Sequence, residues 1–242
     1  ACLEHNETLC EMPKYLGARL NGGYSDHIIV PHSKYIVSYG DMDPAQAAPY
    51  ACSGLTAFSA LKKIPLTSKD DWIIIIGAGG VGINGILLSP ATHKAKILVI
   101  DNDPDKRKKA IEAGANEAFS PDDETEIRNK IGIGASAAID FVGRPETTDL
   151  GLSLVKKGGM VIVVGLYGGS LKLSLPLVPM KSMTLRGSYV GELKELKELV
   201  NIIKSGKIKL IPVKKQGLET ANQAMSDLRS GKVNGRIVLI PN

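Results

Sequence analysis

The stretch Trp72-Ile-Ile-Ile-Ile-Gly-Ala-Gly-Gly-Val-Gly82 decides the fold, because four consecutive isoleucines run into a turn with the spacing Gly77-x-Gly79-x-x-Gly82. An unbroken run of β-branched residues is typical of a parallel strand that is buried on both faces. The glycines permit a tight turn at Gly77, a close backbone approach to a pyrophosphate at Gly79 and close helix packing at Gly82. The stretch therefore predicts a dinucleotide-binding turn.

A second strand-like run follows at residues 96–101 and ends in Asp101. This aspartate comes about 20 residues after the turn, where the motif requires an acidic partner for the adenosine ribose. A helix opening at Gly80 and Val81 would point its free N–H groups at the pyrophosphate. Because a carboxylate accepts hydrogen bonds from both ribose hydroxyls and repels a 2′-phosphate, we expect NAD rather than NADP. The structural alternative, Asp101 as a helix N-cap, is weaker because Asp103 before Pro104 already suits that role.

The composition indicates a folded globular protein, since 43% of the 242 residues are hydrophobic. A net charge of +5 is compatible with a nucleic-acid partner, but the densest basic run, 106–109, fits an exposed helix face. The chain also has only three Phe and one Trp, which are few for base stacking. Residues 72–91 lack charge, yet their glycines and Pro90 divide them into strand, turn and helix rather than a membrane span. We expect no nucleic-acid or membrane partner and, with no secretory signal visible, a cytoplasmic location.

Strand and helix signals alternate through the middle of the chain. They predict an α/β fold, a doubly wound parallel sheet, over residues 54–191. Pro90 is expected to end the first helix of this region early. Residues 1–53 are interpreted as β-rich, with a strand at 24–30. The expected strands lie near 72–76, 96–101, 136–141, 159–164 and 183–188, followed by helices at 192–205 and 218–230 and strands at 210–213 and 236–240.

The cysteines point to a family. Cys2 and Cys10 are separated by seven residues, and Cys52 lies in Ala48-Pro-Tyr-Ala-Cys-Ser-Gly-Leu-Thr56. On these motifs and the glycine turn, the whole chain resembles the zinc-containing medium-chain alcohol dehydrogenases, with their patterns C-x-x-C-x-x-C-x(7)-C and A-P-x-x-C-x-G-x-T. The resemblance implies that Cys2 and Cys10 bind structural zinc and that Cys52 binds catalytic zinc. It also implies that Thr56 is a catalytic residue on the nicotinamide side of the cofactor.

The resemblance assigns further cofactor contacts. It places Lys106 on the adenosine ribose, Val81 against the nicotinamide, and Arg236 on the pyrophosphate. Taken singly, each has a structural alternative, such as a surface charge or a strand-end core residue, but their family order and spacing favour the cofactor role. The complete predicted set is Thr56, Gly77, Gly79, Gly80, Val81, Gly82, Asp101, Lys106, Val142, Gly143, Leu166 and Arg236, with Val142, Gly143 and Leu166 lining the nicotinamide pocket.

The family begins with a GroES-like catalytic domain whose other zinc ligands are missing from this sequence. Residues 1–53 are therefore interpreted as the C-terminal part of that domain, 54–191 as the NAD-binding domain and 192–242 as a return to the catalytic domain. Tetrahedral structural zinc takes four ligands and catalytic zinc takes three protein ligands. The chain offers two and one, so we expect weak or no zinc binding by this chain alone and a complete enzyme that holds zinc at Cys52.

The function implied is that of an NAD-dependent zinc alcohol dehydrogenase, which moves hydride between a primary or secondary alcohol and NAD⁺ and yields an aldehyde or ketone. Two alternatives stay open: a zinc-free quinone reductase of the same superfamily, which has no use for the three cysteines, and an inactive NAD-binding or dimerisation module. Residues 182–191 end the sheet as an apolar edge, which predicts a homodimer or homotetramer.

Overall fold

The computed structural model describes residues 6–65, 67–233 and 235–241. It divides into two compact units, one formed by Ala1–Leu55 with Val190–Asn242 and the other by Thr56–Tyr189. Helix α2 (Ser53–Lys62) contains the boundary between them. The assignment of the first unit to a GroES-like domain stays a prediction.

The second unit is built on a sheet of six parallel strands in the order β3-β2-β1-β4-β5-β6. The order reverses between β1 and β4, which makes that position the switch point of a doubly wound sheet and confirms the predicted fold class. The strands are β1 (Trp72–Ile76), β2 (Lys96–Ile100), β3 (Glu117–Phe119), β4 (Ala135–Asp140), β5 (Val155–Val163) and β6 (Thr184–Gly187).

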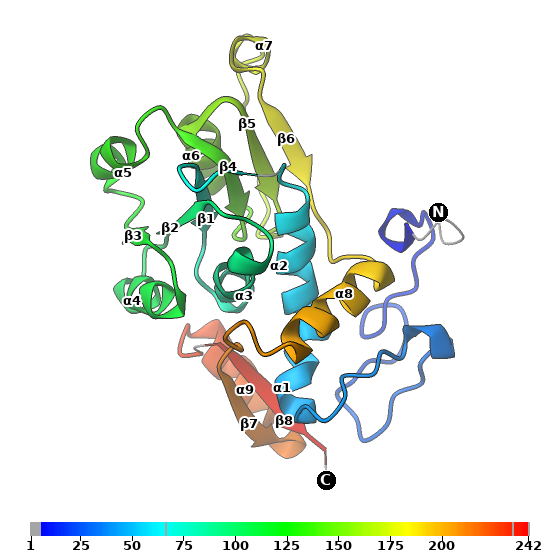
Figure 1. The fold of residues 1–242 in the computed structure, drawn as a ribbon. Helices are drawn as coiled ribbons and strands as arrows, with labels where there is room; N and C mark the ends of the chain where they lie inside the picture. Colours follow the sequence, from blue (N-terminus) through cyan, green and yellow to red (C-terminus); the bar gives the residue numbers. More distant parts are fainter. Residues whose placement is uncertain (1–5, 66, 234, 242) are drawn as a thin grey trace. The chain divides into compact units, whose positions relative to one another are not determined.

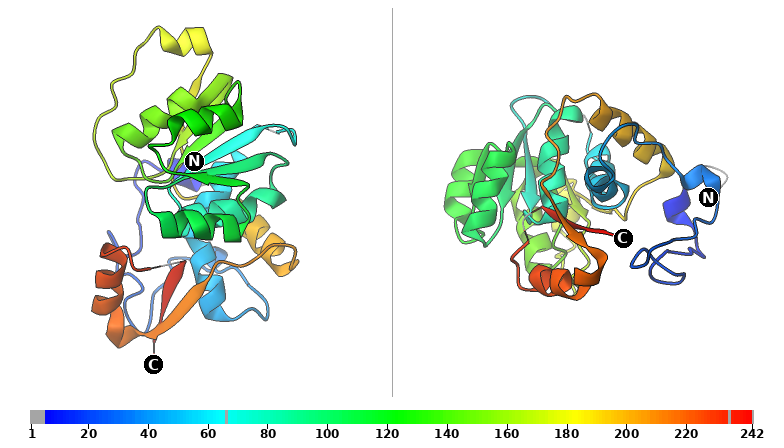
Figure 2. Two further views of the ribbon diagram at one scale, coloured as in Figure 1. Left: turned by 90° about the vertical axis from the view of Figure 1, so that its left-hand side faces the viewer. Right: turned by 90° about the horizontal axis from the view of Figure 1, so that it is seen from below.

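Helices cover both faces of this sheet, so the isoleucines of β1 are fully buried. Figure 1 shows α3 and α4 on one face and α5 and α6 on the other. Figure 2 shows the connection between β5 and β6 as a long loop that carries α7. Helix α3 ends at Leu88, just before Pro90, as predicted. The helices are α3 (Gly80–Leu88), α4 (Pro104–Ala113), α5 (Glu124–Ile131), α6 (Pro145–Leu154) and α7 (Leu177–Lys181).

Two features of the sheet differ from the sequence prediction. Strand β3 was not predicted, because it has only three residues and all are half-buried, which gives no hydrophobic run. Strand β5 begins at Val155 rather than at 159. Its first part contains Lys156, Lys157 and two glycines, a composition that hides a strand, and the pairing with β4 shifts register there.

The first unit contains a small βαβ arrangement, in which β7 (Val213–Gly217) and β8 (Arg236–Ile240) pair in parallel. The helix predicted at 192–205 is confirmed as α8 (Leu193–Lys204), and the one at 218–230 begins as η6 (Leu218–Thr220) and continues as α9 (Ala221–Arg229). The remaining short elements are η2 (Glu7–Leu9), η3 (Ser33–Tyr35), α1 (Pro44–Ala47) and η4 (Ala48–Ala51).

Two strand predictions in this unit are wrong. The strand expected at 210–213 lies instead at Val213–Gly217, because pairing with β8 selects those residues although Lys214 and Lys215 are polar. The segment 24–30 is not a strand. It has the right β-branched residues, but a strand needs a neighbour for its backbone hydrogen bonds, and in the described part of residues 1–53 the only pairing is an isolated bridge between Leu16 and Leu20.

Within the described residues, every helix is too short or too polar to cross a lipid bilayer.

Candidate nucleotide site

The glycine turn lies at the carboxyl end of β1, next to the switch point. Gly77 has a φ of +93°, and its N–H donates to the carbonyl of Ile100 at 2.8 Å. A Cβ on Gly82 would lie 1.9 Å from the oxygen of Gly77, so the first turn of α3 packs directly on the loop. A Cβ on Gly79 would meet no atom within 4 Å, which leaves the space above Gly79 open. The turn is therefore tightly packed where Gly82 meets Gly77 and open to an approaching ligand at Gly79.

Helix α3 begins at Gly80 with Gly79 as its N-cap, and no described side chain caps it. The N–H groups of a first helical turn have no partner inside the helix. Together with the positive end of the helix dipole, they form a site for an anion. Val81 is half-buried in this first turn. The arrangement fits the pyrophosphate of a dinucleotide.

Asp101 lies beside the turn, directly after β2. Its Oδ2 accepts the N–H of Ala78 at 2.7 Å, and its Oδ1 accepts the N–H of Asp103 at 2.9 Å. An ionised carboxylate has about four lone-pair sites, so two remain for ribose hydroxyls. Asp103 is the N-cap of α4 as expected, since its Oδ1 accepts the N–H of Asp105 at 2.9 Å. The partly exposed Lys106 has its Nζ 3.9 Å from Asp103 Oδ2.

Val142 and Gly143 lie on the other side of the switch point, in the loop after β4. A Cβ on Gly77 would come 2.8 Å from Cγ2 of Val142, so this side chain contacts the glycine turn. Gly143 has a φ of +76°. Leu166 follows β5 and is 79% exposed. The structure thus brings Val142 to the turn and leaves Leu166 open to solvent on the neighbouring loop.

Asp140, to which the sequence analysis assigned no role, ends β4 and is fully buried. Its carboxylate accepts the backbone N–H groups of Val142 and Gly143 and the hydroxyls of Thr147 and Thr148. Two sequence signals could have found it: an aspartate that closes an apolar strand, and a threonine pair in the helix that follows.

Two other predicted residues belong to the first unit. Arg236 donates from Nε to the hydroxyl of Ser53 at 3.0 Å, and that buried hydroxyl donates to the carbonyl of Pro49 at 2.9 Å. Burial lowers the pKa of Arg236, and the proximity of Cys52 works in the opposite direction. Arg236 therefore contacts the residue that directly follows Cys52. Thr56 lies in the part of α2 that belongs to the second unit, where it is half-buried.

The predicted zinc ligands do not form a site in the described part of the chain. Cys52 is exposed and Cys10 is half-buried, while Cys2 lies outside the described residues. In residues 6–65, 67–233 and 235–241, no three histidine, cysteine or acidic side chains are placed to hold a metal ion. Zinc needs at least three protein ligands. The described residues therefore do not fit a zinc ion.

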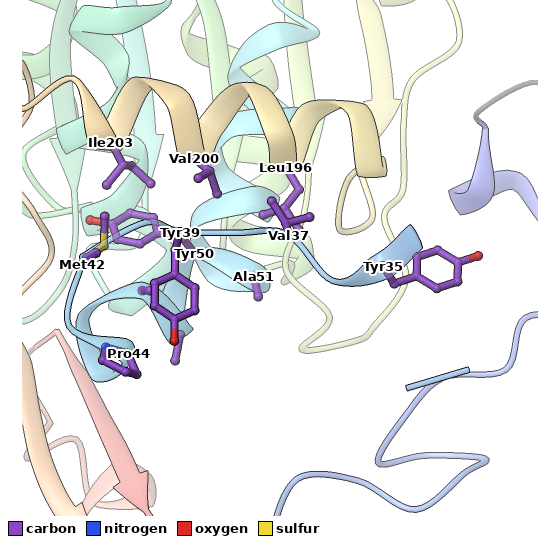
Figure 3. A pocket seen from close by; sticks show the side chains of 12 residues that line it. Tyr35, Val37, Tyr39, Met42, Pro44, Tyr50, Ala51, Leu196, Val200 and Ile203 are labelled. Atoms are coloured by element: carbon purple, nitrogen blue, oxygen red, sulfur yellow. The ribbon is translucent and has the colours of Figure 1, made fainter. Parts of the chain in front are cut away.

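The first unit also holds an apolar pocket of about 280 Å³, which the sequence analysis missed. Figure 3 shows Tyr39, Met42 and Ile203 grouped at one end and Tyr35 at the other. The spacing of Leu196, Val200 and Ile203 on α8 was a signal for it, since residues four and three apart share one face of a helix. Among the described residues, no acidic or basic side chain lines this pocket. It does not suit a pyrophosphate.

The chain is similar in sequence to proteins of a known family. Residues 80–205 match the family described as zinc-binding dehydrogenase. An NAD-dependent alcohol dehydrogenase from Sulfolobus acidocaldarius is 36% identical, over 98% of this chain and 70% of the relative. The chain belongs to the zinc-binding dehydrogenase family. The resemblance inferred from the cysteines and the glycine turn is thereby confirmed, and the chain spans about 70% of the length of this relative.

Two further proteins are similar to this chain. The D-arabinose 1-dehydrogenase (NADP(+)) from Saccharolobus solfataricus is 34% identical, over 99% of this chain and 70% of the relative. The crystal structure of the alcohol dehydrogenase from Aeropyrum pernix has a TM-score of 0.84 and 30% identity, over 97% of this chain and 70% of that one. Relatives of similar identity thus differ in the cofactor that their names state.

Proposed function

We propose that this zinc-binding dehydrogenase binds NAD and catalyses hydride transfer between a primary or secondary alcohol and NAD⁺, giving an aldehyde or ketone. The observation that carries the proposal is the open glycine turn at the uncapped start of α3, with the Asp101 carboxylate hydrogen-bonded to that turn. The names of the alcohol dehydrogenase relatives support the reaction type. Bound NAD supplies the hydride acceptor.

Each residue has a role in this proposal. The pyrophosphate binds at Gly79, Gly80 and the N–H groups of α3, where the helix dipole favours an anion. Asp101 accepts the ribose hydroxyls, and Lys106, on the first turns of α4, contacts the same ribose. Gly77 and Gly82 shape the turn. The remaining predicted contacts are Thr56, Val81, Val142, Gly143 and Leu166 for the nicotinamide half and Arg236 for the pyrophosphate. Binding in this way orients the nicotinamide ring and excludes water from it.

The choice of NAD over NADP rests on Asp101. Its carboxylate lies beside the turn with two lone-pair sites unused by the protein contacts above. A ribose 2′-hydroxyl can donate to these sites, whereas a 2′-phosphate would bring negative charge to a carboxylate. The NADP-dependent name of the arabinose dehydrogenase relative makes this selectivity a property to measure.

The test is a fluorescence titration of the chain with NADH and with NADPH, followed by assays of the full-length enzyme with primary and secondary alcohols and added Zn²⁺. We expect NADH to bind at least about tenfold more tightly than NADPH, a difference of about 1.4 kcal/mol. The absence of NADH binding would contradict the cofactor assignment. NADH binding without alcohol turnover by the full-length enzyme in the presence of Zn²⁺ would favour the non-catalytic NAD-binding module. Zinc-independent reduction of quinones would favour the quinone-reductase alternative.

The oligomeric state is a second proposal. Strand β6 is the last strand of the sheet, and all its residues, Thr184–Gly187, are exposed. An exposed edge strand is a template for pairing with another chain. We infer a homodimer that pairs through β6, with a tetramer of such dimers as its extension. A monomer in size-exclusion chromatography with light scattering would contradict it. The cytoplasmic location stays a prediction.

A further inference from the structure

We propose that Asp140 is a positioning residue of the cofactor site: its buried carboxylate holds Val142 against the glycine turn and so sets the affinity for NAD. The inference rests on the proposed NAD binding and adds a residue that the family motifs did not assign. Asp140 itself does not reach the open side of the turn, since its side chain is fully buried. It acts through the loop that follows it.

The hydrogen bonds of Asp140 define that loop. Oδ1 accepts the N–H groups of Val142 and Gly143, each at 2.9 Å, and Oδ2 accepts the hydroxyls of Thr147 and Thr148, each at 2.8 Å. A buried carboxylate costs free energy unless donors satisfy it. Half of these donors are the N–H groups of the loop, so the carboxylate and the loop are satisfied only together. The threonine hydroxyls anchor the other oxygen to the first turn of α6.

The carbonyl oxygen of Asp140 extends the control to the neighbouring loop after β5. It accepts the N–H groups of Val164 at 2.9 Å and Gly165 at 3.0 Å. The two loops continue in contact beyond this point, with Tyr167 N–H donating to Val142 O at 3.3 Å. The Arg144 guanidinium then lies 3.5 Å from the centre of the Tyr167 ring. Asp140 therefore holds both loops in place, the loop after β4 through its carboxylate and the loop after β5 through its backbone carbonyl.

Val142 transmits the position of these loops to the cofactor site. Its Cγ2 packs against Gly77, so closely that a Cβ added to Gly77 would lie only 2.8 Å from it. Because packed atoms respond to displacements of a few tenths of an ångström, a shift of the Val142 backbone changes either this contact or the turn itself. The N–H of Gly77 is in turn held by Ile100, next to Asp101. The path from Asp140 to the dinucleotide turn is thus a chain of direct contacts.

The experiment compares Thr148→Val with Ser136→Ala in the full chain. Thr148 is chosen because its hydroxyl bonds only to Asp140 among the described contacts, whereas the hydroxyl of Thr147 also lies 3.0 Å from Arg144 O. Ser136 provides the matched control. It lies near the other end of β4 and donates to the Asp71 carboxylate at 2.6 Å. Each variant removes one hydrogen bond from a hydroxyl to a carboxylate, and the two bonds lie at opposite ends of β4.

The measurements are the Kd for NADH, followed by the fluorescence of the bound nicotinamide, and the unfolding midpoint. We expect both variants to lower the midpoint, but only Thr148→Val to raise the Kd, by at least about threefold. Asp140→Asn should raise it by at least as much. Thr148→Ser keeps the hydroxyl and should bind NADH as tightly as the original chain. Comparing it with Thr148→Val tests the inference even where Asp140→Asn fails to fold.

Two results would overturn the inference in different ways. An unchanged Kd in Thr148→Val and Asp140→Asn, with a lowered unfolding midpoint, would show that Asp140 only stabilises the fold, while NAD binding by the unaltered chain would stand. A failure of the unaltered chain to bind NADH would remove the proposed function and this inference with it.

Discussion

Gly143 and Gly165 lie backbone against backbone where the loops after β4 and β5 meet. A Cβ on Gly143 would come 2.0 Å from the oxygen of Gly165, and one on Gly165 would come 2.0 Å from the carbonyl carbon of Val142. No side chain fits at either position without moving the backbone. The contact explains why both loops need glycine here, independently of any cofactor.

Gly143→Ala should therefore destabilise the second unit. Its φ of +76° disfavours alanine, and the added Cβ collides with a backbone oxygen, so we expect a loss of at least about 2 kcal/mol. Gly168→Ala is the control, because Gly168 has a φ of +104° but no atom within 4 Å of its Cβ position. It should cost only about 1 kcal/mol. Urea unfolding followed by the fluorescence of Trp72, the single tryptophan, measures both. Equal losses would contradict the predicted collision.

Gly79→Ala and Gly82→Ala should separate binding from folding. Gly79 has open space around its Cβ position, so the alanine variant should fold with a stability within about 0.5 kcal/mol of the original. Its methyl group would occupy the approach of the pyrophosphate, and the affinity for NADH should fall at least about tenfold.

Gly82→Ala has the opposite expectation. Its Cβ would lie 1.9 Å from Gly77 O, so the variant should lose at least about 2 kcal/mol of stability. Trp72 fluorescence in urea gives the stability, and NADH titration gives the affinity. If Gly79→Ala bound NADH as tightly as the original chain, the dinucleotide would not bind above this turn.

Asp101→Asn should reduce the preference for NADH over NADPH. The substitution removes the negative charge that opposes a 2′-phosphate, and we expect the ratio of the two Kd values to shift at least about fivefold towards NADPH. Asp103→Asn is the matched control. It removes a neighbouring carboxylate, but asparagine caps a helix as well as aspartate does. An equal shift in both variants would indicate general charge rather than contact with the ribose.

The sequence predicted strands most clearly where burial on both faces produces a continuous run of hydrophobic residues. The isoleucines of β1 and the apolar run of β2 are buried on both faces, and a continuous hydrophobic run records that directly. Strands β3 and β7 have no such run, because Glu117, Lys214 and Lys215 lie in them, and their pairing depends on neighbours distant in sequence. Segment 24–30 shows the converse, a strand composition without a pairing partner.

The candidate site was predictable to the extent that its residues act through backbone shape and charge. Gly77, Gly79 and Asp101 belong to a motif with fixed spacing, and the structure brings Asp101 to the turn through Ala78. The function of Asp140 depends on complete burial and on donors from the loop and helix that follow, which only the folded chain supplies. The aspartate that closes an apolar strand and the threonine pair in the next helix mark Asp140 as a candidate in the sequence, but they do not show its burial or its hydrogen bonds.

Asp71, Lys156 and Ser136 form a cluster at the start of β1, β4 and β5, at the opposite end of the sheet from the glycine turn. Asp71 Oδ1 accepts Lys156 Nζ at 2.7 Å and Ser136 Oγ at 2.6 Å, and Oδ2 accepts the N–H of Ser68 at 2.8 Å. Lys156, followed by Ser136 and the Ser68 N–H, holds the pKa of Asp71 well below its ordinary value of 3.8. The cluster therefore ties the charge of one carboxylate to the stability of three strands.

The lowered pKa of Asp71 predicts how the stability of the folded chain depends on pH. Because the pKa of Asp71 is lower in the folded than in the unfolded chain, the stabilisation is complete above the unfolded value near 3.8 and is lost as the pH falls below it. Asp71→Asn should cost about 1–2 kcal/mol at pH 7 and progressively less below pH 3.8. Lys156→Met removes the largest contribution and should flatten the same pH dependence. Urea unfolding from pH 3 to pH 7, followed at the adjacent Trp72, tests this, and a constant difference between Asp71→Asn and the original chain across that range would contradict it.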